Sequence, residues 1–133
     1  MPGVASDTLY QNALRDFTTG KYDMSQQEFG DYVKNYPNTD LASNAQFYIG
    51  EIAYQQKKYE DAVNAYNAVL EGFSGNPKAP AAQLHKGLAL LALNKKDAGI
   101  HELRGLIQRY PRTPEAGSAR SKLNGLGVRI TAK

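Results

Sequence analysis

The chain contains few residues that could carry out catalysis. Its two histidines, His85 and His101, stand sixteen positions apart, and no HExxH spacing accompanies them. A zinc site of that type places two histidines on one helix face beside a general base. The serines lack a GxSxG turn, and Gly125 and Gly127 lack the lysine and following helix of a phosphate-binding loop. The sequence therefore predicts no enzymatic activity, no metal site and no cofactor.

Length and composition indicate a single folded domain. The 133 residues are 41% hydrophobic and 22% charged, and a chain of this size buries about two thirds of its unfolded surface. It has no cysteine, so the chain as given offers no disulfide, thiol catalyst or lipidated cysteine. The longest apolar run, GLALLAL at 87–93, is far shorter than the roughly 20 residues of a membrane-spanning helix. The opening residues MPGVAS are not expected to be an export signal.

The uneven distribution of charge suggests nucleic-acid binding as an alternative function. Segment 104–133 carries seven Lys or Arg residues and a single acid, Glu115. A basic end can meet nucleic acid or an acidic protein surface, although a solvated tail is the simpler interpretation. Nucleic-acid binding would weaken steeply with salt, and a gel-shift assay without retention would dismiss it. Four residues would carry this binding: Arg120, Lys122, Arg129 and Lys133. The tyrosines and phenylalanines recur at helix-packing positions, which favours a core role over base stacking.

One phrase of the sequence occurs twice. Residues 36–45 read YPNTDLASNA and residues 110–119 read YPRTPEAGSA, so the copies start 74 positions apart. A shift of half that distance, 37, reveals a diverged middle copy, FSGNPKAPAA, at 73–82. A fixed period of this length indicates stacked structural repeats. The shift aligns Ala13 with Gly50 and Gly87, Phe17 with Tyr54 and Leu91, Phe29 with Tyr66 and Leu103, and Tyr32 with Val69 and Leu106.

Within each unit the apolar residues follow a helical period. In the second unit, residues 59–73 place them at i, i+3, i+4 and i+7 after a polar break at QQKK, 55–58. Each unit is therefore predicted to be a helical hairpin. The small residues Ala13, Gly50 and Gly87 are expected to let the two helices of a unit approach closely.

The repeated phrase is expected to join one hairpin to the next. Pro37 and Pro111 disfavour helix at the tyrosines that precede them. Thr39 or Asp40, and Thr113, suit the N-cap of the following helix. The phrase is therefore predicted to separate repeats rather than to form a site.

The second unit carries the consensus of a known repeat. Residues 47–70, FYIGEIAYQQKKYEDAVNAYNAVL, resemble the tetratricopeptide repeat at Gly50, Tyr54, Tyr59 and Ala62. More narrowly, three stretches are similar to the C-terminal repeat domain of the Tol-Pal-associated periplasmic YbgF family, also called the cell-division coordinator CpoB. They are YPNTDLASNAQFYIGEIAYQQKKYEDA, NPKAPAAQLHKGLALLALNKKDAG and RYPRTPEAGSARSKLNGLG.

The period and the resemblance together predict the architecture. We expect an all-α tetratricopeptide-repeat superhelix of three helical hairpins and a C-terminal capping helix. The expected boundaries are a disordered leader at 1–5, a single domain at 6–127 and a tail at 128–133. Within the domain, the repeats are expected at about 6–37, 41–74 and 79–111, and the capping helix at 114–127.

Some positions depart from the repeat pattern. Asn12 stands at the large apolar position of Ile49, and Ser25 replaces the packing residue Ala62, so the first repeat is expected to be degenerate. Gly99 occupies the position of Ala62 in the third repeat and is expected to weaken that helix by up to about 1 kcal/mol. The signal peptide and N-terminal coiled coil of the YbgF family are not found in this chain. Export and a possible trimer are thus implied only by the resemblance.

The first helices of stacked hairpins line a concave groove. The register places thirteen residues there: Asp7, Tyr10, Leu14 and Phe17; Asn44, Phe47, Glu51, Tyr54 and Gln55; and Ala81, Leu84, Leu88 and Ala92. Tyr10, Phe47 and Leu84 occupy equivalent positions. They are expected either to form an apolar ladder for an extended or helical peptide, beside Glu51 and Gln55, or to pack between units. If they bind, Phe47→Ala or Tyr10→Ala should weaken binding while helicity stays intact.

The sequence therefore predicts a non-enzymatic module that binds a protein or peptide. Chaperone-type repeats hold a C-terminal carboxylate with a lysine and an asparagine, but Tyr10 and Leu14 stand at those positions, which argues against that mode. The YbgF resemblance implies a periplasmic protein of the bacterial cell envelope. It also implies TolA as the partner, and the coordination of outer-membrane constriction with peptidoglycan synthesis during division as the process. A second interpretation is a repeat protein of outer-membrane assembly, which would need a lipidated cysteine upstream.

Overall fold

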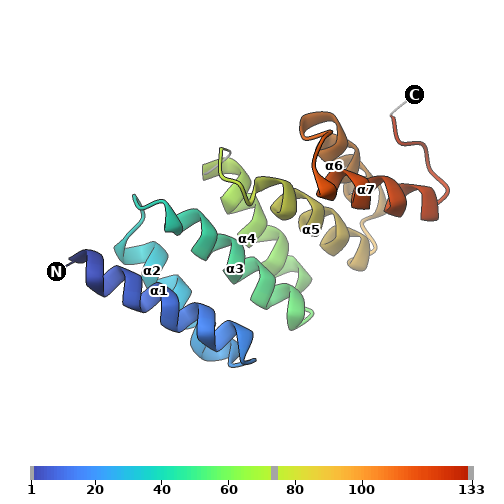
Figure 1. Ribbon diagram of the computed structural model, residues 1–133. Helices are drawn as coiled ribbons and strands as arrows, with labels where there is room; N and C mark the ends of the chain where they lie inside the picture. Colours follow the sequence, from blue (N-terminus) through green and yellow to red (C-terminus); the bar gives the residue numbers. More distant parts are fainter. Residues whose placement is uncertain (1, 73–74, 132–133) are drawn as a thin grey trace.

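The structure is an array of helices stacked along one direction (Figure 1). The computed structural model describes residues 2–72 and 75–131, and no strand occurs among them. The helices are α1 (Pro2–Thr18), α2 (Tyr22–Asn35), α3 (Leu41–Gln55), α4 (Tyr59–Gly72), α5 (Ala79–Ala92), α6 (Lys96–Arg109) and α7 (Pro114–Gly125). The all-α class predicted from the sequence is confirmed.

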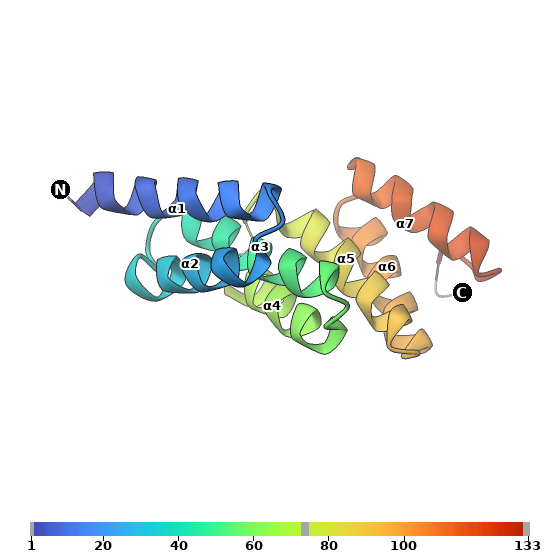
Figure 2. The ribbon, with the colours of Figure 1, turned by 90° about the horizontal axis from the view of Figure 1, so that it is seen from below.

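The helices pack in chain order. Each helix contacts the next one, and α1 also contacts α3 while α5 contacts α7. In Figure 2, α1, α3, α5 and α7 follow one another, with α1 and α7 rising on either side of α3 and α5. These four helices therefore line the concave face. Because contacts run only between near neighbours, stability comes from consecutive interfaces, as in other repeat proteins.

Small residues mark the place where the helices of each pair cross. At Gly50, a Cβ atom would lie 2.6 Å from the Tyr66 ring, and at Gly87 it would lie 2.9 Å from Leu103. Both glycines are buried, so the prediction of close approach is confirmed there. Gly99 also lies at such a crossing, because a Cβ atom there would lie 2.8 Å from Leu91 and 3.0 Å from the carbonyl oxygen of Gly87. Glycine lowers helix stability at this position, but it also allows α5 and α6 to pack closely.

The same crossing in the first pair uses a hydrogen bond. Ser25 is completely buried, and its Oγ donates to the carbonyl oxygen of Ala13 over 2.7 Å. Burying a hydroxyl is tolerated because it is paired in this way. Ser25 thus joins α2 to α1 at the position where Ala62 and Gly99 join the other pairs.

The turns inside the three pairs share one backbone conformation. Gly20, Lys57 and Asn94, each 37 positions apart, have φ values of 81°, 61° and 60°. This left-handed region is natural for glycine but costs an L-residue roughly 1–2 kcal/mol. The conformation is retained in all three turns although only the first has a glycine.

The junctions between pairs are only partly as predicted. Helices α2 and α6 end at Asn35 and Arg109, one residue before the tyrosine of each Tyr-Pro step. The Oγ1 of Thr113 accepts from the backbone N–H of Ala116 over 3.1 Å and caps α7 as expected. The expected cap on α3 is absent, because Asp40 makes no side-chain cap. Its neighbour Thr39 instead bonds through Oγ1 to Tyr32 Oη at 2.8 Å. Phe73, which begins the middle junction, lies outside the described residues.

Both ends of the chain differ from their predictions. Helix α1 already begins at Pro2, where residues 1–5 were expected to be a disordered leader. Proline suits the first position of a helix, since its missing N–H would have no partner there. At the other end, Val128 packs against the third core cluster, so the segment 128–131 is not a loose tail. Residues 1, 132 and 133, including the predicted nucleic-acid contact Lys133, lie outside the description.

Candidate interaction surface

Three of the predicted groove residues are packed inside the structure. Tyr10 and Phe47 are each 5% exposed, and Leu84 is 8% exposed. The Tyr10 ring lies 5.7 Å from those of Phe29 and Tyr32 on α2. Each of the three side chains belongs to one of the hydrophobic core clusters. The three side chains therefore form no ladder of exposed anchors and are part of the core.

The centre of the concave face holds a hydrogen-bonded cluster. The carboxylate of Glu51 on α3 accepts from Tyr66 Oη of α4 over 2.6 Å, and its Oε1 lies 2.6 Å from Nδ1 of His85 on α5. The His85 ring lies between 5.9 and 6.1 Å from the rings of Phe47, Tyr54 and Tyr66. Glu51 was predicted as a site residue, but the sequence offered no sign that His85 would join it.

Burial governs the acidity of the tyrosines around this cluster. Loss of solvation, followed by the nearby carboxylate of Glu51, raises the pKa of Tyr66 above its ordinary value. Loss of solvation is also the largest cause that raises the pKa of Tyr54, followed by the charge interaction with Tyr59. Both hydroxyl groups therefore stay protonated at physiological pH, and that of Tyr66 donates to Glu51.

Further along the face, predicted residues converge on a hollow of about 740 Å³. Tyr54 of α3 meets Leu88 and Ala92 of α5 there, as the repeat register predicted. The hollow has five further lining residues that were not predicted as site residues: Leu91, Asn94, Lys96, Lys122 and Leu126. We refer to these eight residues as the concave hollow. Leu126 had a sequence signal, since it follows Leu123 by three positions in the predicted capping helix 114–127 and both are apolar.

The remaining predicted residues do not line the hollow. Leu14 and Phe17 pack at the edge of the first core cluster, and the Phe17 ring lies 5.3 Å from that of Tyr48. The side chain of Asn44 bonds to the hydroxyl of Tyr10. Asp7 and Gln55 are exposed, and Ala81 is half-buried at the edge of the second cluster. The predicted groove residues therefore fall into three groups: residues buried in the core, residues at cluster edges or in solvent, and residues of the concave hollow.

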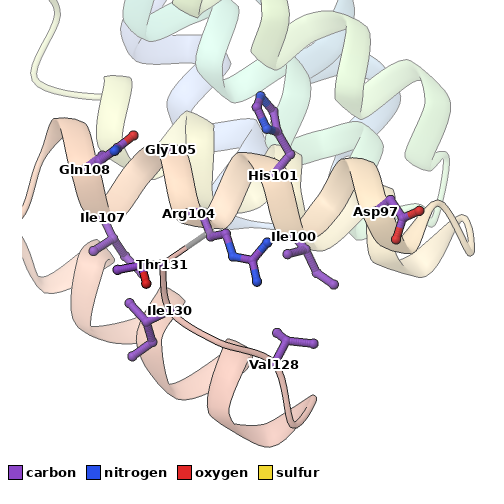
Figure 3. Close-up of a pocket in the computed structure, with 10 residues that line it drawn as sticks. All are labelled: Asp97, Ile100, His101, Arg104, Gly105, Ile107, Gln108, Val128, Ile130 and Thr131. Atoms are coloured by element: carbon purple, nitrogen blue, oxygen red, sulfur yellow. The ribbon is translucent and has the colours of Figure 1, made fainter. Parts of the chain in front are cut away.

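A second cleft lies away from the concave face. It occupies about 610 Å³ between α6 and the segment 128–131 (Figure 3). The Nε of Arg104 donates to the carbonyl oxygen of Arg129 over 3.0 Å and holds this segment on α6. Four aliphatic side chains line the cleft: Ile100 and Ile107 of α6, and Val128 and Ile130 of the segment. The chain's own C-terminal residues thus already cover this side of α6.

The described residues offer no arrangement for metal chemistry. Across 2–72 and 75–131, no group of three or more histidine, cysteine or acidic side chains could hold a metal ion. In the same part of the chain, no helix has the length and apolar character needed to cross a membrane.

Comparison with known proteins identifies the class. The tetratricopeptide-repeat family model matches residues 10–77 and 58–114. The chain therefore belongs to the tetratricopeptide-repeat family, whose stacked hairpins present extended surfaces for binding other proteins. It is also similar to the outer membrane protein assembly factor BamD of Caulobacter vibrioides, at 22% identity over 135 residues. That alignment covers 96% of this chain and 44% of BamD, so the chain spans less than half of its relative's length.

Proposed function

We propose that this chain binds a segment of a partner protein in the concave hollow and works in the assembly of outer-membrane proteins. The observation that carries the binding role is the hollow itself. It exposes the apolar surface of Leu88, Leu91 and Tyr54 on the face where repeat proteins bind their partners. The process rests on the similarity to the assembly factor BamD along nearly the whole chain. We also propose a periplasmic location, which the resemblance to the YbgF family implies and the similarity to an outer-membrane assembly factor supports.

A second candidate process is favoured by the sequence of the junctions. The Tyr-Pro steps at Tyr36 and Tyr110, with the alanines that follow, resemble the YbgF family. In that case the partner would be TolA, and the chain would coordinate envelope constriction with peptidoglycan synthesis. Both candidates use the same concave hollow, so they differ in the partner and not in the binding surface.

Site-specific photocrosslinking in the native organism tests the binding role and the process together. A photoreactive phenylalanine at Leu88 faces the hollow, and the same group at Met24, which is 57% exposed on α2, is the matched control. We expect a partner crosslinked from position 88 and not from position 24. Outer-membrane assembly proteins among the products support the first process, whereas TolA supports the second. Equal products from both positions, or none from position 88, would overturn the proposed surface.

A further inference from the structure

We propose that the concave hollow selects a partner segment that carries an apolar anchor side chain flanked by carboxylates. This inference rests on the proposed function and adds the chemistry of the partner to it. The starting observation is a pair of lysines on two sides of the hollow. Lys96 is the first residue of α6, Lys122 lies on α7, and both are exposed.

Neither lysine is neutralised within the described part of the chain. The ion pairs there join His85 to Glu51 and Lys86 to Glu102, the second at 2.6 Å. Lys96 and Lys122 take part in neither. A partner that brings carboxylates to them would gain charge-assisted hydrogen bonds without breaking an existing pair.

The acidic side chains near the hollow do not line it. The carboxylate of Glu51 already accepts from Tyr66 and contacts His85. Asp97, next to Lys96 in sequence, lines the cleft between α6 and the segment 128–131 (Figure 3). Glu115 lies in the first turn of α7, two turns before Lys122 on that helix. The cationic rim of the hollow therefore has no acidic counterpart lining it.

The floor of the hollow is apolar and has a different role. Leu88, Leu91 and Leu126 are half-buried at the edge of the third core cluster, and the ring of Tyr54 adds a fourth apolar wall. An apolar side chain that enters the hollow would displace water from these groups and supply affinity. The lysines on either side then discriminate between partners, because charge complementarity mainly contributes specificity.

A displayed library of random twelve-residue peptides tests the proposal without knowledge of the natural partner. The wild-type chain, Lys96→Glu/Lys122→Glu and Leu88→Lys are used as baits. A matched control, Lys34→Glu/Arg112→Glu, makes the same change of charge at exposed positions that do not line the hollow. Circular dichroism confirms that all variants fold. The most enriched wild-type peptide is then synthesised with a fluorophore and titrated by anisotropy.

We expect the wild type to enrich peptides with Asp or Glu next to a leucine-sized or aromatic residue. The Lys96→Glu/Lys122→Glu variant should lose this acidic preference and bind the selected peptide at least about tenfold more weakly, as expected for two partly screened charge pairs. The control should retain both preference and affinity. Wild-type affinity should also fall between 50 and 500 mM NaCl because the lysines are exposed.

The outcomes separate this inference from the proposed function. If the wild type enriches apolar peptides without acids, and if Leu88→Lys abolishes their binding, the acidic partner is wrong while the binding surface stands. If Leu88→Lys binds the selected peptides as tightly as the wild type, the binding surface itself is wrong. An equal loss in the control variant would assign the acidic preference to the overall charge of the chain and overturn the inference.

Discussion

The Nδ1 atom of His85 lies 2.6 Å from Oε1 of Glu51, and this contact connects the third pair of helices to the second. Tyr66 donates to the same carboxylate oxygen. The contact therefore ties α3, α4 and α5 together at the centre of the concave face. Because the two side chains are 29% and 18% exposed, the pair is only partly shielded from water.

Breaking this contact should loosen the interface between the second and third pairs. We expect a double-mutant cycle with Glu51→Gln and His85→Ala to give a coupling energy of about 1 kcal/mol in the free energy of unfolding, since the pair is partly solvated. Urea titrations of the four chains measure it. His101→Ala, an exposed histidine on α6, is the control partner and should show no coupling to Glu51→Gln. Additive effects for Glu51 and His85 would show that the contact contributes nothing.

Gly50→Ala should destabilise the chain by about 1–3 kcal/mol, because the new methyl group would lie 2.6 Å from the Tyr66 ring, which is completely buried. Gly30→Ala is the matched control on α2, where no atom lies within 4 Å of the new methyl group. That change should stabilise the chain by about 0.5–1 kcal/mol through helix propensity. Thermal unfolding of both variants checks the opposite signs, and two changes of the same sign would contradict the packing argument.

Lys57→Gly should raise the free energy of unfolding by up to about 1 kcal/mol, although it adds a flexible residue. Lys57 has φ of 61°, which glycine adopts without strain. Its neighbour Lys58 does not have a positive φ, so Lys58→Gly should lower stability by several tenths of a kcal/mol. Urea unfolding of the two variants is the measurement. Destabilisation by Lys57→Gly would mean that the left-handed turn carries no strain.

The first pair of helices should lose stability as pH rises. Burial and the carboxyl group of Asp16 raise the pKa of Glu28 to about 7. Since this lies above the ordinary value of 4.5, the folded chain binds the proton more tightly. The stabilising contribution is complete below about pH 4.5 and is lost as pH rises through 7.

Glu28→Gln should remove this pH dependence. Between pH 5 and pH 8, wild-type stability should fall by roughly 1–2 kcal/mol relative to the variant, less than the full shift implies because Glu28 is partly solvated. Asp16→Asn should also reduce the dependence of stability on pH, since it removes the negative charge that raises the pKa of Glu28. Parallel profiles of the wild type and Glu28→Gln would contradict the assignment.

Phe47→Ala should act on stability, although the sequence predicted an effect on binding. The ring is 5% exposed and lies 6.0 Å from that of Tyr66, so truncation should cost about 3–5 kcal/mol. Chemical unfolding measures this loss. Leu88→Ala, at the half-buried edge of the concave hollow, is the comparison and should cost clearly less. Similar costs at the two positions would show that burial does not separate core from surface here.

Much of the fold could be read from residue spacing. The 37-residue period located the helix pairs, because every repeat must present its apolar stripe to its neighbours. Pro37 and Pro111 located the helix ends, because proline acts on the residue before it. The cap predicted on α3 is not formed, since Thr39 Oγ1 bonds instead to the hydroxyl of Tyr32 and to the carbonyl oxygen of Tyr36.

The candidate site was less accessible from the sequence. Tyr54, Leu88 and Ala92 line one hollow, and their position depends only on the register of α3 and α5, while their role in binding stays a prediction. Tyr10, Phe47 and Leu84 share a register with each other, but register does not distinguish a side chain that faces the groove from one that enters the next interface.

The sequence alone determined the repeat, its period, the helical class and the turns, because these depend on interactions between residues close along the chain. The tertiary structure decided which aromatic rings are buried, that His85 reaches Glu51 across 34 positions, and that Lys96 and Lys122 border one hollow. Those facts depend on how far each pair of helices rotates relative to the next. That rotation results from the fit of many side chains together, such as Phe29 against Tyr48 and Phe47 against His85, and no single spacing in the sequence encodes it.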